Sequence, residues 1–365
     1  MSTSNASMTA TTSVRRAMNE EATLGRRGYT VGIQIGEGSY AQVYSCVDER
    51  RKRKCAMKIV NRRKAPSDFL QKFLPRELHL LKKVNHCHVI QLYEIFEFGS
   101  KVYISMEIAG HGDLLDYIKL RRYLPEFSAR SFCRQLVSGI GYLHELDIVH
   151  RDLKCENILL SDKNEIKISD FGFARETLTG NLMNTFCGSA AYAAPEVLQG
   201  QAYKGKQYDA WSLGVILYIM VCGTMPFDDS NIKKMIRDQM DQRISFNKKR
   251  TVTQPFRDCI LAILHPDPEK RLTVERMMDD PWISDTSGCD VIDDVIVNNT
   301  PLGESAPPSQ VVTVERTTEV VEMANRTPRS DIGRTVVIPS RRRAARDDDS
   351  DESTSGESSN KLPRL

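Results

Sequence analysis

Residues 150–157 read HRDLKCEN, and residues 170–172 read DFG. The first stretch places the carboxylate of Asp152 five residues before the amide of Asn157, with Lys154 between them. Asp170 adds a second carboxylate after a distance that suits a short hairpin. A carboxylate that can accept a proton, followed by an amide and a carboxylate that can hold a metal ion, indicates catalysis. The three residues HRD alone could arise by chance in a chain of this size. Both stretches at this spacing are not expected to.

This order and spacing are typical of the catalytic loop and metal loop of protein kinases, which transfer a phosphoryl group from a nucleotide. In this interpretation Asp152 accepts the proton of the substrate hydroxyl, and Lys154 lies near the γ-phosphate. Asn157 and Asp170 hold Mg²⁺ ions, which neutralise the charge that develops during transfer. A lysine two residues after the aspartate is the form that serine/threonine kinases carry.

Composition indicates a water-soluble globular protein of 365 residues, with 40% hydrophobic and 27% charged residues. The net charge of +3 does not argue for a nucleic-acid partner. The nine cysteines include no C-x-x-C pair, which predicts reduced intracellular thiols rather than disulfides or a zinc site. The longest apolar run, residues 213–222, is too short to span a membrane and predicts a buried helix. Without a secretory signal, a cytoplasmic location is expected, with the nucleus as the alternative.

Three zones follow one another along the chain. Residues 1–27 are rich in Ser, Thr and Ala and predict a disordered N-terminal segment. Residues 28–283 alternate apolar strands and amphipathic helices, whereas residues 284–365 form a charged, Ser/Thr-rich tail that predicts disorder. The middle zone reads as an α+β, bilobal protein-kinase fold, with a β-rich N-lobe at about 28–108 and an α-helical C-lobe at about 109–283.

Apolar periodicity predicts the main elements of both lobes. Strands are expected at 29–35, 41–47 and 55–60, and helices at 67–84, 129–146 and 211–222. In the tail, the basic run 341–343 precedes the acidic run 347–349. A solvated, regulated linker is favoured there over contact with nucleic acid or histones.

A glycine-containing turn joins the first two expected strands. Its glycines let the backbone approach phosphate oxygens and offer N–H groups to them. An isolated G-x-G equally suits an ordinary hairpin turn, but the strand that follows, 55–58, favours phosphate binding here. Kinases carry a third glycine where this chain has Ala41. The predicted nucleotide-binding residues of the turn are Gly36, Glu37, Gly38, Ser39, Tyr40, Ala41, Gln42 and Val43.

Lys58 ends an apolar strand, where an unpaired ammonium group would be costly. The helix that follows supplies Glu77, and the pair is predicted to hold the α- and β-phosphates, so that the position of the helix gates activity. The alternative is that Glu77 is only a solvated charge on the helix surface. Arg76 is interpreted as such a charge.

The residues between Asp170 and the APE at 194–196 form an activation loop by position. Thr185 is the preferred phosphosite, because a phosphate there adds nearly two negative charges that can pair with Arg151. Thr177 and Thr179 are alternatives, and an unmodified loop threonine is another.

Structural contacts are also predicted around the loop. His150 is expected to pack against Phe171 rather than act as an acid or base. Residues 209–214 begin the buried helix on which the catalytic loop rests. Glu196 is expected to pair with Arg271, a buried ion pair that matters more for folding than for chemistry.

With these motifs the chain resembles the eukaryotic protein kinases and, more narrowly, the testis-specific serine/threonine kinase family of the calcium/calmodulin-kinase-like group. The resemblance covers residues 28–283 and neither tail. Ala41 is typical of this family, so it does not indicate an inactive pseudokinase. The stretches that carry the resemblance are 28–29, 36–41, 64–66, 68–70, 72–77, 185–200 and 211–232.

The resemblance implies phosphorylation of Ser or Thr in protein substrates with ATP and Mg²⁺, activation-loop phosphorylation, and a role in spermatogenesis and differentiation. It places Asp113 and Glu156 where this group reads a basic residue N-terminal to the target. Partners are protein substrates, with an upstream activating kinase and a chaperone as further candidates, and neither a membrane nor a nucleic acid. The alternative is a catalytically weak, nucleotide-binding pseudokinase scaffold, which the full catalytic set disfavours. The remaining nucleotide-binding residues implied are Ile35, Ala56, Glu107 and Leu159.

Overall fold

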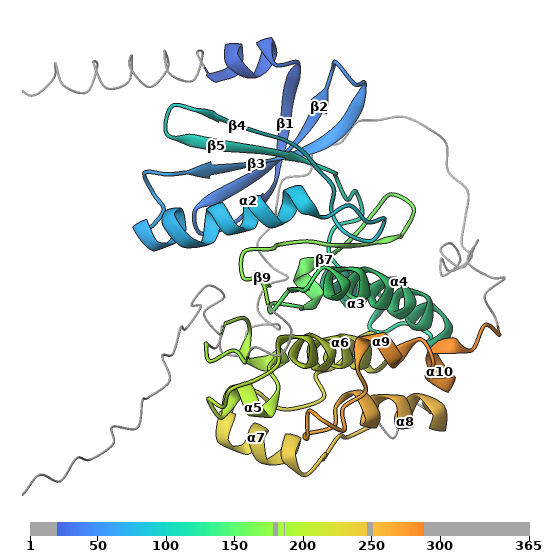
Figure 1. Ribbon diagram of the computed structural model, residues 1–365. Coiled ribbons are helices and arrows are strands. Elements are labelled where there is room, and N and C mark those ends of the chain that lie inside the picture. The colour runs from blue at the N-terminus through green and yellow to red at the C-terminus, as the bar shows by residue number, and fades with distance from the viewer. Residues whose placement is uncertain (1–19, 178–181, 186, 247–250, 288–365) are drawn as a thin grey trace, which may run out of the picture.

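The computed structural model describes residues 20–177, 182–185, 187–246 and 251–287. These residues form two lobes, a sheet with one long helix and a larger helical body (Figure 1). The predicted bilobal α+β fold is therefore confirmed. Thr179, in the activation loop, and the tail from residue 288 onward lie outside the described residues.

The N-lobe sheet is antiparallel, with strand order β1-β2-β3-β5-β4. Buried Met57, Phe96 and Tyr103 form an apolar cluster on it, and the rings of Phe96 and Tyr103 stack 4.9 Å apart. The three strands predicted from alternation are all present. The strands are β1 (Tyr29–Glu37), β2 (Ala41–Asp48), β3 (Arg53–Asn61), β4 (Leu92–Phe98) and β5 (Lys101–Met106).

The helix predicted at 67–84 is divided into a π-helical turn, η1 (Phe69–Phe73), and α2 (Leu74–Lys83). The backbone stays helical from one to the other, since Phe73 and Leu74 both have αR dihedral angles, and Pro75 follows the π-helical turn directly. In Figure 1, α2 lies along the sheet on the side of the C-lobe. From this helix Glu77 reaches Lys58 of β3, the central strand of the sheet.

The helical residues 20–26 differ from the expectation of a disordered segment at 1–27. Leu24 is buried in the same apolar cluster as Tyr29 and Met57. Glu20 accepts hydrogen bonds from Lys101 Nζ at 2.8 Å and Tyr103 Oη at 2.5 Å. The ordered N-lobe thus begins at least as early as Glu20, because long-range contacts to β5 hold a stretch that is too short to show periodicity.

The C-lobe is built around α4 and α6, and most of α6 is buried, as the apolar run at 213–222 predicted. The catalytic loop lies between β6 and β7, and the metal loop lies between β8 and β9. β7 and β8 form a short hairpin, and β6 pairs with β9 around it. No helix among the described residues is long and apolar enough to cross a membrane. The elements are α3 (Leu114–Arg121), α4 (Glu126–Glu145), β6 (Ile148–Val149), η2 (Cys155–Asn157), β7 (Ile158–Leu160), β8 (Ile166–Ile168), β9 (Arg175–Glu176), η3 (Ala190–Tyr192), α5 (Pro195–Leu198), α6 (Gly205–Cys222), α7 (Ile232–Met240), α8 (Gln254–Ile263), α9 (Val274–Met277) and α10 (Pro281–Ser284).

Asp209 in α6 supports the catalytic loop from below. Its carboxylate accepts hydrogen bonds from the backbone N–H groups of His150 and Arg151, both at 2.8 Å. The predicted ion pair is also present, since Arg271 contacts both carboxylate oxygens of Glu196 at 2.8 and 3.0 Å. Both predictions about these supporting contacts are confirmed.

One cysteine pair corrects the expectation of free thiols. Cys46 and Cys55 are directly opposite residues of β2 and β3, and the structure joins them as a disulfide. Facing positions on antiparallel strands bring two side chains together, which spacing along the chain does not reveal. The other described cysteines are free thiols.

Candidate active site

The catalytic loop and the metal loop each contain a residue in the left-handed backbone region. Arg151 has φ 64° and Asp170 has φ 63°, values that are rare for residues with side chains. His150 packs on Phe171 with ring centroids 5.4 Å apart, and its Nε2 lies 3.0 Å from the carbonyl oxygen of Ser169. His150 therefore joins the two loops, as predicted, and its ring is occupied by structural contacts.

The two carboxylate oxygens of Asp152 differ in their contacts. Oδ2 lies 3.1 Å from Lys154 Nζ and accepts a hydrogen bond from Asn157 Nδ2 at 3.0 Å. Oδ1 is buried and has no hydrogen-bond partner among the described residues. Burial raises the pKa of this carboxyl, against the opposing effects of Lys154 and His150. An unpaired buried acceptor is costly, so Oδ1 is poised to take a hydrogen bond from a hydroxyl group.

Asn157 and Asp170 offer oxygen ligands beside that carboxylate. The Nδ2 of Asn157 is committed to the carbonyl oxygen and the carboxylate of Asp152, which leaves its amide oxygen as an acceptor. Asp170 is open to solvent and accepts one backbone hydrogen bond, from Gly172. Although the surrounding protein raises the pKa of Asp170, Lys58 and this hydrogen bond hold it below its usual range.

These two ligands suit Mg²⁺, which is commonly held by one or two protein oxygens together with phosphate oxygens and water. The described part of the chain contains no cluster of three His, Cys, Asp or Glu side chains that would form an all-protein metal cage. The residues present therefore fit a metal that arrives with a nucleotide rather than a permanently bound structural ion.

Lys58 and Glu77 form the predicted ion pair, with 2.6 Å between Nζ and Oε1. Burial alone would lower the pKa of Lys58, but Glu77 and Asp170 outweigh it and raise that pKa. Glu77 is buried within α2, whereas Lys58 keeps some exposure. A charged ammonium group is thus fixed between the sheet, α2 and the metal loop.

The glycine turn links β1 to β2 at the edge of the same region, and Gly38 N–H donates to the carbonyl oxygen of Ala41 at 2.8 Å. Ile35 is half exposed on β1, and Ala56 is buried opposite Met106 of β5. Leu159 lies on β7 of the C-lobe. Strands from both lobes thus bring these predicted nucleotide-binding residues to the region between the lobes.

The side chain of Glu107 has other partners. It forms an ion pair with Lys167 at 2.5 Å, and its backbone N–H donates to the carbonyl oxygen of Gln91 at 2.8 Å. The backbone carbonyl oxygen of Glu107 is therefore the group that a ligand can contact. The sequence predicted that Glu107 binds the nucleotide but did not specify which of its atoms does so.

Thr185 is exposed, and its carbonyl oxygen accepts a hydrogen bond from Tyr203 Oη at 3.0 Å. The alternative Thr177 follows β9, and its N–H donates to the carbonyl oxygen of Asp147. The side chain of Thr185 is therefore accessible, with its backbone fixed to the C-lobe.

Arg151 was predicted to pair with a phosphate on Thr185, but sequence reasoning missed two further arginines, Arg76 and Arg175, that act on one another electrostatically with it. Besides burial, Arg151 and Arg175 lower the pKa of Arg76, which places the three positive charges close together. Cys187 lies beside them, since Arg151 and Arg76 both act to lower its pKa against the effect of burial. None of the three arginines forms an ion pair with a carboxylate within the described ranges. Arg76 was interpreted as a solvated charge, although its position directly before Glu77 was a signal.

Asp113 precedes α3, and Glu156 lies in η2. Burial raises the pKa of Cys155 to about 12, and the carboxylates of Glu156 and Asp113 add to this effect. Glu156 is exposed and its Oε2 accepts a weak hydrogen bond from Tyr192 Oη at 3.4 Å, while Asp113 caps α3. Asp113 also forms a β-bridge with Leu159, two residues after Asn157, so both acidic residues are held beside the catalytic loop.

Comparison with known proteins agrees with this geometry. Residues 29–283 match the protein kinase domain family. The chain is 54% identical to mouse testis-specific serine/threonine-protein kinase 1 over 73% of its own length and 74% of that protein. It is 52% identical to mouse testis-specific serine/threonine-protein kinase 2 over 73% of its length and 76% of that protein. Identity to mouse NUAK family SNF1-like kinase 1 is 38% over 73% of the chain and 41% of that protein.

A bilobal fold, a complete set of catalytic side chains at the lobe junction and this degree of identity lead to one assignment. The chain is a protein serine/threonine kinase and belongs to the testis-specific serine/threonine-protein kinase family.

Proposed function

We propose that this kinase transfers the γ-phosphate of ATP to Ser or Thr side chains, with Asp152 as the group that orients the hydroxyl and accepts its proton. The unpaired, buried Oδ1 of Asp152 carries this proposal. Its raised pKa makes it a better proton acceptor than an ordinary carboxylate. Lys154 and Asn157 hold the other oxygen, so the carboxylate keeps a single orientation.

In the proposed site, Asn157 and Asp170 hold Mg²⁺ through their oxygens. When bound, the metal supplies positive charge that offsets the charge developing on the transferred phosphoryl group. Lys58, held by Glu77, contacts the α- and β-phosphates, and the N–H groups of the glycine turn cover them. Ile35, Ala56, Leu159 and the carbonyl oxygen of Glu107 complete the nucleotide site.

The substrate preference that we propose is a basic residue N-terminal to the target. Support comes from Glu156, which is exposed within the catalytic loop, and from Asp113, which is bridged to Leu159 just after that loop. A guanidinium group can contact both carboxylates, which a lysine's single ammonium group does less well. At Ile219 some basophilic kinases carry a further acid, but here the side chain is buried and apolar, so we do not propose recognition of a second arginine.

Activation is proposed to require phosphorylation of Thr185. Arg76, Arg151 and Arg175 provide a concentration of positive charge without a carboxylate partner among the described residues. A phosphate on Thr185 would relieve their mutual repulsion and join α2 to the catalytic loop. Since α2 also carries Glu77, the same contact would hold the Lys58 partner in place.

The relatives' names lead us to propose a role in sperm-cell differentiation. The proposed partners are protein substrates, an upstream activating kinase and a chaperone, in the cytoplasm or alternatively the nucleus.

A direct test combines purified full chain, Mg²⁺-ATP and matched serine peptides. We expect transfer to a peptide with an arginine N-terminal to the serine, and a loss of at least about a thousandfold in Asp152→Asn. Replacing the arginine by alanine should cost about tenfold or more in kcat/KM, and Glu156→Gln should remove most of that difference. Equal, negligible transfer by the parent protein and Asp152→Asn, with Thr185 phosphorylated, would contradict the proposed catalytic role.

A further inference from the structure

An exposed patch lies where α3 is connected to α4. Leu120 is 83% exposed, Tyr123 46% and Phe127 39%, although all three are large apolar side chains. Between them lie Arg121 and Arg122, both exposed and neither paired with a carboxylate in the described structure. We call these five residues the α3–α4 patch. Neighbouring apolar side chains bordered by positive charge are typical of a binding surface.

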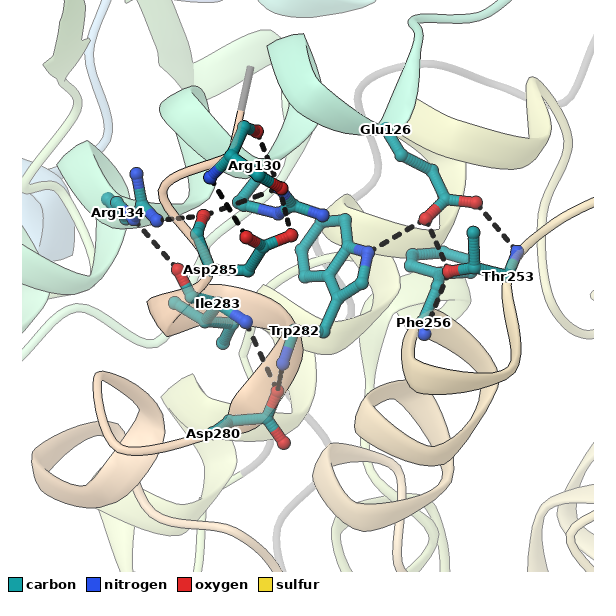
Figure 2. Close-up of polar contacts among 10 residues, drawn as sticks. Glu126, Arg130, Arg134, Thr253, Phe256, Asp280, Trp282, Ile283 and Asp285 are labelled. Atoms are coloured by element: carbon teal, nitrogen blue, oxygen red, sulfur yellow. Dashed lines mark hydrogen bonds and ion pairs between the residues drawn. The ribbon is translucent and has the colours of Figure 1, made fainter. Parts of the chain in front are cut away.

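The chain that follows α10 lies against α4, where Ile283 and Asp285 are next to Arg134 and Arg130 (Figure 2). Arg134 Nε donates to the carbonyl oxygen of Ile283 at 2.7 Å, and Arg134 also contacts the carbonyl oxygen of Asp285. Arg130, one turn earlier in α4, donates to the carbonyl oxygens of Asp285 and Ser287 at 3.3 and 3.4 Å. Successive residues thus contact successively earlier turns of α4.

Two further contacts fix the chain after α10 against α4. The carboxylate of Asp285 forms an ion pair with the buried Arg130 at 2.7 Å, and the guanidinium group of Arg130 lies 5.1 Å from the ring of Trp282. Phe127 is three residues before Arg130, so it lies on the same face of α4, about 5 Å further along. Phe127, and beyond it Tyr123 and Leu120, therefore lie ahead of Ser287 in the direction that the described chain takes along α4.

The sequence directly after Ser287 complements the patch. Residues 289–297 read CDVIDDVIV and contain five aliphatic residues and three aspartates. The patch offers apolar side chains and two arginines, so both the apolar surface and the charge are matched. Nine residues can span up to about 30 Å, which is more than one turn of α4 and the short connection to α3 require.

We propose that residues 289–297, which we call the exit segment, dock on the α3–α4 patch of the same chain. The aliphatic residues cover Leu120, Tyr123 and Phe127, and the aspartates pair with Arg121 and Arg122. Because the segment is tethered next to the patch, its effective concentration is high and modest contacts suffice. Since Asp113 is the N-cap of α3, docking also steadies the helix that this acidic residue caps.

Cysteine cross-linking in the full chain tests this proposal, because the exit segment already contains Cys289. Leu120→Cys supplies a partner within the patch, and Met240→Cys on α7 is the control, since Met240 is also an exposed apolar residue at 48%. Both variants carry Cys87→Ser, which removes the exposed native thiol. With glutathione disulfide as oxidant, we expect the Leu120→Cys variant to form the intramolecular disulfide with Cys289 on the order of tenfold faster than the control.

A charge exchange adds a second readout. Arg121→Glu with Arg122→Glu, and Asp293→Lys with Asp294→Lys, should each slow the cross-link severalfold, and combining all four should restore it. Equal rates for the Leu120→Cys and Met240→Cys variants would overturn the proposal. So would disulfides between chains that disappear on dilution, since the occupant would then be a second copy.

Discussion

Gly188 of the activation segment lies against the carboxylate of Asp152. A Cβ atom built on Gly188 would lie 3.0 Å from Oδ1 of Asp152 and 2.8 Å from the carbonyl oxygen of Arg151. Gly188 also has φ 95°, which disfavours any side chain. The activation segment therefore passes close to the one oxygen of Asp152 that has no partner in the described structure.

Gly188→Ala is expected to lower kcat by at least about tenfold, because the added methyl group displaces the catalytic carboxylate. Gly200→Ala is the matched control. Gly200 has φ 70°, but a Cβ there meets nothing within 4 Å. Thermal unfolding should show a loss of stability in both variants, larger in Gly188→Ala because of its close contacts, and steady-state kinetics should show a loss of kcat only in Gly188→Ala. Equal kcat in the two variants would show that the contact is unimportant.

Glu77→Gln should lower kcat/KM by about a hundredfold, since the neutral amide no longer fixes the Lys58 ammonium group at 2.6 Å. The control is Glu97→Gln, which removes an exposed ion pair with Arg62 in the same lobe. Kinetics at varied ATP concentration measure the effect. An unchanged kcat/KM in Glu77→Gln would argue against the proposed role of the pair.

The raised pKa of Asp152 predicts the acid limb of the kcat/KM profile. Activity requires the ionised carboxylate, so it falls as the pH drops through this pKa, at a higher pH than an ordinary aspartate would give. Lys154 lowers this pKa, so Lys154→Met should move the acid limb of the residual activity to still higher pH.

Lys163→Met, a change at an exposed residue outside the catalytic set, should leave the limb where it is. A limb that shifts equally in both lysine variants would assign it to another group.

Arg76→Ala should reduce the activation that follows Thr185 phosphorylation by about tenfold while leaving the unphosphorylated enzyme nearly unchanged. The reason is that Arg76 contributes charge to the arginine cluster but has no carboxylate partner within the described residues. Lys82→Ala, at an exposed position of the same helix, is the control. Activity assays on stoichiometrically phosphorylated and unphosphorylated samples provide the comparison; the same activation ratio in both variants would exclude Arg76 from the phosphate site.

Glu196→Gln should destabilise the fold by about 3–5 kcal/mol, because it leaves the fully buried guanidinium group of Arg271 without its counter-charge. Glu269→Gln, which removes an exposed pair with Lys204, should change the free energy of unfolding by less than about 1 kcal/mol. Denaturant unfolding gives both values. Similar losses in the two variants would mean that the buried pair is no more important than an exposed one.

Much of the site was predictable because its chemistry is written in short motifs. Asp152, Lys154 and Asn157 lie within one loop, and their roles follow from residue type and spacing. Lys58 and Glu77 are distant in sequence, but a lysine at the end of an apolar strand requires a partner, and the next helix offers one. The strands at 29–35 and 41–47 were predicted from alternation, which local sequence carries.

Local patterns could not predict the contacts that join separate elements. Arg76, Arg151 and Arg175 come from α2, the catalytic loop and β9, and only the packing of the lobes brings their charges together. The helix at 20–26 was missed because it is held by β5 and not by its own periodicity. Cys46 and Cys55 face each other through strand register.

The sequence by itself determined the fold class and the type of reaction and indicated the proposed catalytic set, because residue type and spacing along the chain encode them. The tertiary structure alone decided which oxygen of Asp152 is left unpaired, where Gly188 lies against it, and toward which face of α4 the chain leaves α10. These features depend on burial and on contacts between residues far apart in sequence, which only the packed chain specifies.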